Sequence, residues 1–193
     1  MQRIGVLALQ GDVSEHITAL ERAISGPGEV VEIRKSGQME QCQGLVLPGG
    51  ESTAIFRQLE RSGLTEELKA AAISGKPVLA TCAGLVLVSK EIDGDTRLKP
   101  LGLMDIKISR NAFGPQRESF EADLGIVGME RPYRAVFIRA PAIAEVGPGV
   151  QVLAKVGDAV VAARQKNLLA LAFHPELTDD ARVHQIFLKM LED

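Results

Sequence analysis

Short apolar runs alternate with amphipathic stretches through the first two thirds of the chain, and this alternation restricts the possible folds more than any other feature. The apolar runs cover residues 4–9, 30–33, 45–47 and 78–80, and the amphipathic stretches cover residues 15–24 and 53–74, the second with a break at Gly63. Runs that are apolar at every position are typical of strands buried on both faces. The pattern therefore predicts a parallel sheet with helices on both faces, joined by right-handed crossovers.

The pattern changes after about residue 103, where β-branched and alternating segments are separated by Gly and Pro. These segments cover residues 106–108, 135–139, 150–156 and 160–163, and they predict added, partly antiparallel strands. A buried strand over 168–173 and a closing helix from Asp179–Asp180 to Met190 follow. We expect one α/β domain over residues 1–193, a three-layer sandwich whose central, mostly parallel sheet gains antiparallel strands in its C-terminal half.

Composition limits the classes of partner. A chain of 193 residues, 46% of them hydrophobic, has enough core to fold without disulfides or metal. The formal net charge of −3, with basic residues scattered among acids, argues against nucleic acid or a membrane as partner and favours small molecules or proteins. The N-terminus is too short in its apolar part for a signal peptide, and two cysteines form no disulfide framework, so we expect a cytoplasmic protein.

Cys82 lies where an apolar run ends and a helix-compatible pattern begins, in the segment Val-Leu-Ala-Thr-Cys-Ala-Gly-Leu over residues 78–85. We expect a strand-to-helix turn here, with the helix after the thiol taking up residues 85–89. The helix dipole and free backbone N–H groups at such a turn favour the thiolate. Taken alone, Cys82 is equally well explained as a small buried hydrophobic residue.

His174 and Glu176 are the candidate base and orienting carboxylate for this thiol. They stand two residues apart in a segment expected to be extended, which would put both side chains on the same side. Each alone has a simpler explanation, a hydrogen-bonded surface histidine and a solvated acid. Zinc binding by Cys82, His174 and Glu176 has no support from ligand spacing, so no metal is predicted.

A glycine turn follows the apolar run at 45–47, in the segment Pro-Gly-Gly-Glu-Ser-Thr over residues 48–53. Its backbone N–H groups are candidates to face an anion, which would make the turn an oxyanion wall. A phosphate loop is a rival interpretation that lacks the Walker lysine. An ordinary strand-to-helix turn capped by Ser52 or Thr53 is the other alternative.

The glycine turn, the cysteine turn and the late His-x-Glu together resemble the class I, triad-type glutamine amidotransferases. One departure is Ala80, which stands where that family usually has the first glycine of Gly-x-Cys-x-Gly. Further motifs resemble one subfamily, the glutaminase subunits of pyridoxal phosphate synthases. They are Leu-Gln-Gly-Asp at 9–12, Glu-His at 15–16, Thr-Cys-Ala-Gly at 81–84, Arg-Asn-Ala-Phe-Gly at 110–114, Ser-Phe-Glu at 119–121, Phe-Ile-Arg-Ala-Pro at 137–141 and His-Pro-Glu-Leu-Thr at 174–178.

The resemblance implies hydrolysis of L-glutamine to glutamate and ammonia, without a cofactor, and delivery of the ammonia to a separate synthase subunit that builds pyridoxal 5'-phosphate. Two enzyme alternatives stay open: a glutaminase subunit of another amidotransferase pathway, and a stand-alone cysteine hydrolase on a similar fold. A regulatory subunit with a vestigial site is a third, disfavoured because nucleophile, base and orienting carboxylate are all present.

The resemblance also implies which residues hold the substrate. The residues that fall where the subfamily binds glutamine are Gly50, Glu51, Ser52, Arg110, Ile138 and Arg139, with the N–H groups of Gly50 and Ala83 facing the oxyanion. The zwitterionic end of glutamine needs partners of both signs, and Arg110 is the first carboxylate candidate. Without the resemblance, Arg110 and Arg139 would be read as surface arginines and Glu51 as a first-turn acid.

Two hypotheses concern the partner subunit. The turn over residues 10–12 and the following helix with Glu15 and His16 are candidate docking surface, although His16 could equally be a solvated helix residue. The Pro48–Gly50 turn is expected to be misaligned until the partner docks, because glycines make a peptide flip sterically easy.

Overall fold

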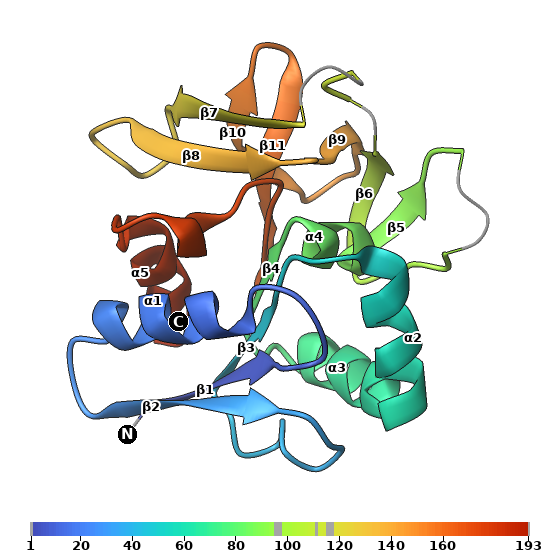
Figure 1. Cartoon of the computed structure of the whole chain (residues 1–193), viewed down its shortest axis with the longest axis vertical. Coiled ribbons are helices and arrows are strands. Elements are labelled where there is room, and N and C mark those ends of the chain that lie inside the picture. The colour runs from blue at the N-terminus through green and yellow to red at the C-terminus, as the bar shows by residue number, and fades with distance from the viewer. Residues whose placement is uncertain (1, 95–97, 111, 115–117, 193) are drawn as a thin grey trace.

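Strands and helices alternate in the first half of the chain, and the computed structural model describes residues 2–94, 98–110, 112–114 and 118–192 (Figure 1). The strands are β1 (Gln2–Leu7), β2 (Gly28–Ile33), β3 (Gly44–Leu47), β4 (Val78–Thr81), β5 (Ser89–Ile92), β6 (Met104–Ser109), β7 (Ser119–Leu124), β8 (Tyr133–Ile138), β9 (Ala142–Val146), β10 (Gln151–Val156), β11 (Ala159–Gln165) and β12 (Leu168–Leu171). The helices are α1 (Val13–Ala23), α2 (Ser52–Ser62), α3 (Leu64–Ile73), α4 (Ala83–Val88), the 3₁₀ turn η1 (Pro175–Leu177) and α5 (Arg182–Lys189).

The main sheet is parallel in its N-terminal half and antiparallel in much of its C-terminal half, as predicted. Its order is β2-β1-β3-β4-β12-β11-β9-β6-β5, and β10 pairs with β11. The pairs among β1, β2, β3, β4 and β12 are parallel, whereas β11 is antiparallel to β12, β9 and β10. Helices α1 and α5 cover one face and α2, α3 and α4 the other, which gives the predicted three layers (Figure 1).

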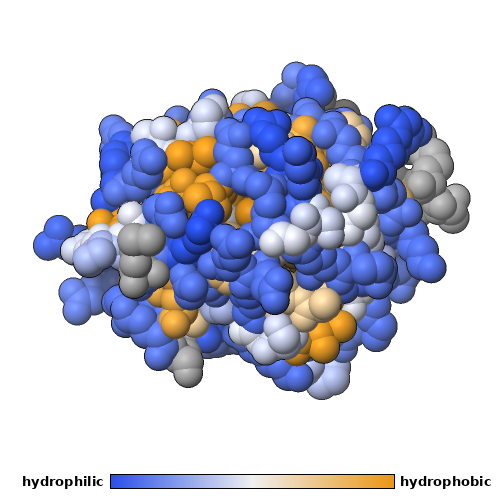
Figure 2. Space-filling model, turned by 90° about the horizontal axis from the view of Figure 1, so that it is seen from below, coloured by the Kyte–Doolittle hydropathy of each residue, from blue (hydrophilic) through white to orange (hydrophobic). Residues whose placement is uncertain are grey.

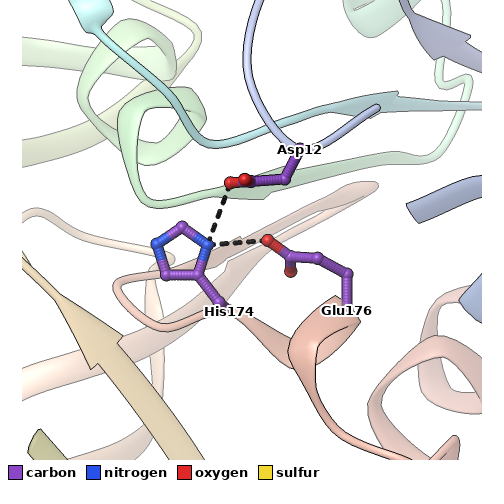
Figure 3. A group of neighbouring side chains, drawn as sticks. All are labelled: Asp12, His174 and Glu176. Atoms are coloured by element: carbon purple, nitrogen blue, oxygen red, sulfur yellow. Dashed lines mark hydrogen bonds and ion pairs between the residues drawn. The ribbon is translucent and has the colours of Figure 1, made fainter. Parts of the chain in front are cut away.

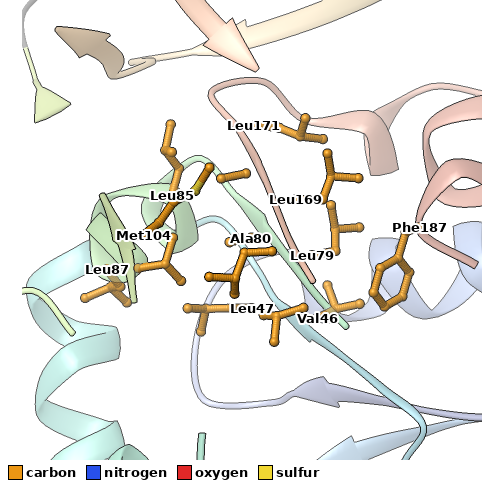
Figure 4. Packing of buried hydrophobic residues seen from close by; sticks show 14 of the residues in the cluster. Val46, Leu47, Leu79, Ala80, Leu85, Leu87, Met104, Leu169, Leu171 and Phe187 are labelled. Carbon is orange, nitrogen blue, oxygen red and sulfur yellow. The ribbon is translucent and has the colours of Figure 1, made fainter. Parts of the chain in front are cut away.

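The central strands are apolar at nearly every position because both of their faces are covered. Strands β3, β4 and β12 are buried along their whole length, and their side chains meet α4 and α5 in one hydrophobic core (Figure 4). Strand β6 instead alternates buried and half-buried residues. The face of the molecule seen in Figure 2 is mainly hydrophilic, with hydrophobic side chains in separate patches.

Several boundaries differ from the sequence-based expectation. The helix after Cys82 ends at Val88, so Ser89 belongs to strand β5. Strand β12 ends at Leu171, two residues early, and α5 begins only at Arg182, where the Asp180 carboxylate accepts a hydrogen bond from the Arg182 N–H at 3.1 Å. The strand expected over 135–139 is β8, which ends at Ile138 and pairs with β7 in a separate two-stranded sheet.

Ala80 fits its strand without displacing its neighbours. It lies inside β4, paired with Leu47 on one side and Ala170 on the other, and is 1% exposed, with its methyl group in the core. The glycine that the turn does require is Gly84, because a Cβ there would overlap the carbonyl oxygen of Leu47. The missing family glycine is therefore compatible with the fold.

Two substitutions test this distinction. Ala80→Gly should lower the free energy of unfolding by about 1–2 kcal/mol, because it loosens a strand interior and removes a buried methyl group. Gly84→Ala should cost more, since the overlapping atom belongs to the backbone. Urea unfolding of both variants measures the difference, and a stabilising Ala80→Gly would show that Ala80 is strained.

Candidate active site

Cys82 is held in an unusual backbone conformation between β4 and α4. Its φ of 48° and ψ of −102° lie in a region that L-residues rarely adopt, at a typical cost of about 1–3 kcal/mol. The neighbouring strand fixes it, because the Cys82 N–H donates to the Leu171 carbonyl at 2.8 Å. Cys82 is 8% exposed, as buried as a core residue, so its strained backbone rather than its exposure sets it apart.

Backbone donors surround this turn. Helix α4 starts at Ala83, and no backbone hydrogen bond recorded among the described residues uses the Ala83 N–H. The Cys82 Sγ lies 3.8 Å from the carbonyl oxygen of Ile138, toward which its S–H points. The turn therefore has a thiol and an available N–H side by side, as an acyl-transfer site needs.

His174 and Glu176 come together, although not in the expected extended segment. His174 follows β12 and Glu176 lies in the 3₁₀ turn η1, where the His174 Nδ1 is 2.7 Å from the Glu176 Oε1 (Figure 3). Both residues are 4% exposed. Pro175 is the first residue of this 3₁₀ turn. The turn, and not the same-side geometry of an extended segment, brings the Glu176 carboxylate to the His174 ring.

A second carboxylate reaches the same ring nitrogen. Asp12, in the turn before α1, has its Oδ2 atom 3.2 Å from the His174 Nδ1 (Figure 3). Burial disfavours the charged imidazole, but interactions with Asp12, Cys82 and Glu176 outweigh it and raise the pKa of His174. The same hydrogen bond lowers the pKa of Asp12, whereas burial raises the pKa of Glu176 despite the charge of His174.

The ring of His174 faces Cys82 across the glycine turn. A Cβ at Gly49 would lie 2.7 Å from the His174 Cε1 and 3.3 Å from the Cys82 Cβ, so the two side chains flank this glycine. The His174 Nε2 is buried and has no hydrogen-bond partner among the residues that the structure describes. It is the ring atom left to exchange a proton with a substrate or with the thiol.

The glycine turn itself is capped by Glu51, not by Ser52 or Thr53 as the ordinary-turn interpretation proposed. The Glu51 carboxylate accepts hydrogen bonds from the Thr53 and Ala54 N–H groups at 2.9 and 2.7 Å. Although burial acts in the opposite direction, these bonds lower the pKa of Glu51, helped by the nearby charge of Arg110. The Glu51 N–H in turn donates to the Gln10 Oε1 at 2.9 Å.

The other sequence-predicted residues lie around the same turn. Gly50 has a φ of 141°, and Arg110 donates to the Ser52 hydroxyl at 2.8 Å, which links the end of β6 to the start of α2. Ile138 and Arg139 are exposed at the end of β8, and Arg139 has a φ of 44°. Asn111, which belongs to the same motif as Arg110, lies outside the described residues.

Sequence reasoning missed two residues of this site. Asp12 was assigned only to the docking surface, and His16 was expected to be a surface residue, whereas His16 is fully buried behind Glu176. A sequence signal was present: His16 stands three, four and seven residues before Ala19, Leu20 and Ala23, the spacing of one helix face, and this face is the buried one. The expectation that His16 forms docking surface is therefore wrong.

Metal binding at this place would need the hydrogen-bonded atoms themselves. Among the described residues, Asp12, His174 and Glu176 have potential ligand atoms within 4.8 Å of one another. The 2.7 Å contact between Nδ1 and Oε1 is that of a charge-assisted hydrogen bond, and it accounts for the cluster without an ion.

A thiol, an imidazole and a carboxylate at one end of a mostly parallel sheet are typical of thiol-dependent hydrolases. The chain belongs to the SNO glutamine amidotransferase family, whose model matches residues 6–193. It is 60% identical, over 98% of this chain and 100% of the relative, to a protein of Methanothrix thermoacetophila named pyridoxal 5'-phosphate synthase subunit PdxT. A protein of the same name from Halalkalibacterium halodurans is 54% identical over 100% of this chain and 96% of that protein.

Solved structures agree with the fold. A crystal structure of a glutamine amidotransferase superposes with a TM-score of 0.90 at 43% identity, over 98% of this chain and 99% of that one. The structure of PurLQS from Thermotoga maritima gives a TM-score of 0.70 over 99% and 95% of the two chains, and at 15% identity it supports the fold alone. The predicted family and fold class are thus confirmed.

The contact between Asp12 and His174 can be tested by titration. Asp12→Asn should lower the pKa of His174, because it removes a negative charge that favours the imidazolium, so the ring should lose its proton at a lower pH. Histidine side-chain NMR can follow this, since the chain has three histidines and burial lowers the pKa of both His16 and His184. Glu15→Gln, an exposed acid on the same helix, is the control. An unchanged His174 titration in Asp12→Asn would contradict the assignment.

Proposed function

We propose that this chain hydrolyses L-glutamine to L-glutamate and ammonia and delivers the ammonia to a separate synthase subunit for pyridoxal 5'-phosphate formation. The observation that carries the proposal is the convergence of Cys82, His174 and Glu176 in a member of the SNO family. Nearly full-length relatives named as subunits of pyridoxal 5'-phosphate synthase support the pathway.

The chemistry follows from the positions of these side chains. The Cys82 thiolate attacks the side-chain amide carbon of glutamine, and the N–H groups of Gly50 and Ala83 stabilise the oxyanion. The His174 imidazolium gives its Nε2 proton to the departing ammonia, which leaves a glutamyl thioester. His174, oriented by Glu176, then takes a proton from water, and hydrolysis of the thioester restores the thiol.

The remaining predicted residues are assigned to binding the α-amino and α-carboxylate groups of glutamine. Arg110 pairs with the carboxylate, because it is held beside the glycine turn by its bond to Ser52. Glu51 offers the opposite charge, and the exposed Ile138–Arg139 backbone forms the other wall beside the thiol. Partners of both signs would exclude amides that lack the zwitterion.

Coupling to the partner subunit involves the turn over residues 10–12. Its Gly11 packs so closely on the Gly49 carbonyl that a Cβ there would overlap it, and Gln10 holds Glu51. Movement of this turn on docking would therefore realign the Pro48–Gly50 segment.

None of the helices in the described part of the chain is long and apolar enough to cross a membrane. We assign the protein to the cytoplasm on its cysteine usage.

Two alternatives differ in substrate or partner. A glutaminase subunit of another pathway would share the triad but respond to a different synthase. A stand-alone cysteine hydrolase would turn over peptides or other amides without a partner. The charged groups beside the glycine turn, Glu51 and Arg110, favour an amino-acid amide over a peptide substrate.

Removal of the nucleophile is the first test. Cys82→Ala should lower glutaminase kcat about 10³-fold or more while glutamine still binds, because the recognition groups remain. Cys42→Ala is a matched control, since Cys42 lies in the segment between β2 and β3, buried beside Gly5 of β1, and its loss should keep full activity. Turnover in the presence of the synthase subunit and calorimetric binding of glutamine separate the two effects. Full activity of Cys82→Ala would exclude the thioester mechanism.

The partner is tested by measuring glutaminase activity with and without the pyridoxal phosphate synthase subunit. We expect activity to rise severalfold on complex formation, because the oxyanion segment is aligned only in the complex. Equal activity of the isolated chain would contradict this gating. Stimulation by an unrelated synthase instead would favour the alternative pathway.

A further inference from the structure

His16 is a buried titratable residue that the proposed reaction leaves unused. It is 0% exposed on α1, and its Nε2 lies 3.0 Å from the Thr81 Oγ1 and 3.3 Å from the Glu176 Oε2. Thr81 directly precedes the nucleophile and Glu176 orients the base. His16 therefore lies between the end of β4, which leads into Cys82, and the η1 turn that holds Glu176.

The surroundings determine which nitrogen of His16 carries the proton. Burial lowers the pKa of His16 well below its usual range, so the ring is neutral and has one N–H. Its Nδ1 has no hydrogen-bond partner among the described residues. A proton on Nδ1 would leave a buried donor unpaired and turn the Nε2 lone pair toward the Glu176 carboxylate. The Nε2–H tautomer avoids both costs: it donates to the Thr81 hydroxyl and turns its N–H toward the Glu176 Oε2, 3.3 Å away.

The groups that pack against His16 do not compete for this proton. The His184 ring, on α5, lies edge-on at 5.7 Å between centroids, and burial lowers the pKa of His184 to about 4, so it too is neutral. Neither nitrogen of His184 has a hydrogen-bond partner among the described residues. The Glu176 Oε2 likewise has no hydrogen-bond partner among the described residues. The His16 Nε2 lies 3.3 Å from this oxygen, and a proton on that nitrogen would face the negative oxygen.

We propose that His16 is a positioning residue, whose Nε2–H holds the outer oxygen of Glu176 and the Thr81 hydroxyl and so fixes the carboxylate against His174. The inner oxygen of Glu176 faces the His174 Nδ1 at 2.7 Å. A donor on the outer oxygen limits rotation of the carboxylate and keeps the inner oxygen in line with the ring. His16 acts through Glu176 and does not touch the substrate.

The proposal rests on the proposed function, and it predicts how two substitutions of equal length should differ. His16→Met removes the donor but keeps an unbranched side chain, and it should lower kcat on the order of tenfold to a hundredfold with little change in KM, because the carboxylate loses the N–H that faces its outer oxygen. His16→Gln can present its amide N–H at the position of Nε2 and should recover most of that loss.

The experiment measures glutaminase kcat and KM of wild type and both variants in the complex with the synthase subunit. Two readouts on the chain itself need no glutamine turnover: the NMR resonance of the His174 Nδ1 proton, and the rate of Cys82 alkylation by iodoacetamide, followed by mass spectrometry of the Cys82 peptide. Thermal unfolding reports whether each variant is folded. Absence of glutaminase activity in wild type would refute the proposed function. The Nδ1 resonance and the Cys82 alkylation rate would still test whether His16 positions Glu176.

Recovery by Gln but not Met, together with a shifted Nδ1 resonance in Met alone, supports the positioning role. Equal losses in folded Met and Gln variants with an unchanged resonance would show that His16 only fills space. Wild-type kcat in His16→Met would also overturn the proposal. If His16→Met does not fold, His16→Gln alone tests the proposal. A kcat of His16→Gln far below that of wild type, with an altered His174 Nδ1 resonance, would contradict the expected recovery.

Discussion

The backbone conformation of Cys82 is the constraint on which the candidate site depends. A φ of 48° is unfavourable for a residue with a Cβ, and it is maintained by the hydrogen bond to Leu171 and by the packing of Gly84 on the Leu47 carbonyl. These contacts join β3, β4 and β12, the three fully buried central strands. The rigidity of the sheet therefore holds the thiol beside the first N–H of α4.

Helix α1 supplies the other half of this arrangement. Its N-terminal turn brings Asp12 to His174, and its buried face brings His16 to Glu176 and Thr81. Polar groups buried in this number are costly unless they bond to one another, since each unpaired donor or charge in a low-dielectric interior is penalised. The cluster thus links α1 and the turn before it to two side chains of the site: Asp12 contacts the His174 imidazole, and His16 contacts the Glu176 carboxylate.

The members of the proposed triad could be singled out in the sequence because each lies next to a local signal. Cys82 ends an apolar run, and His174 and Glu176 stand two residues apart. Asp12 and His16 lacked such a signal of function, because an acid before a helix and a histidine within one have common structural explanations. Their roles appear only when residues more than 150 positions apart are brought into contact. The extended conformation expected for 174–176 was wrong because Pro175 starts a 3₁₀ turn.

Periodicity by itself determined the three layers, the parallel half of the sheet and the helix break at Gly63, because burial on one face or two leaves a direct pattern in the sequence. Motif content determined the family and pointed to Cys82, His174 and Glu176 as the proposed nucleophile, base and orienting carboxylate. Only the tertiary structure decided that β7 and β8 form a separate sheet, that Gly84 rather than residue 80 needs to be glycine, and that His16 lies against Thr81 and Glu176. Each of these depends on contacts between distant strands and helices, and no local stretch of sequence records the atoms that a side chain will meet across the fold.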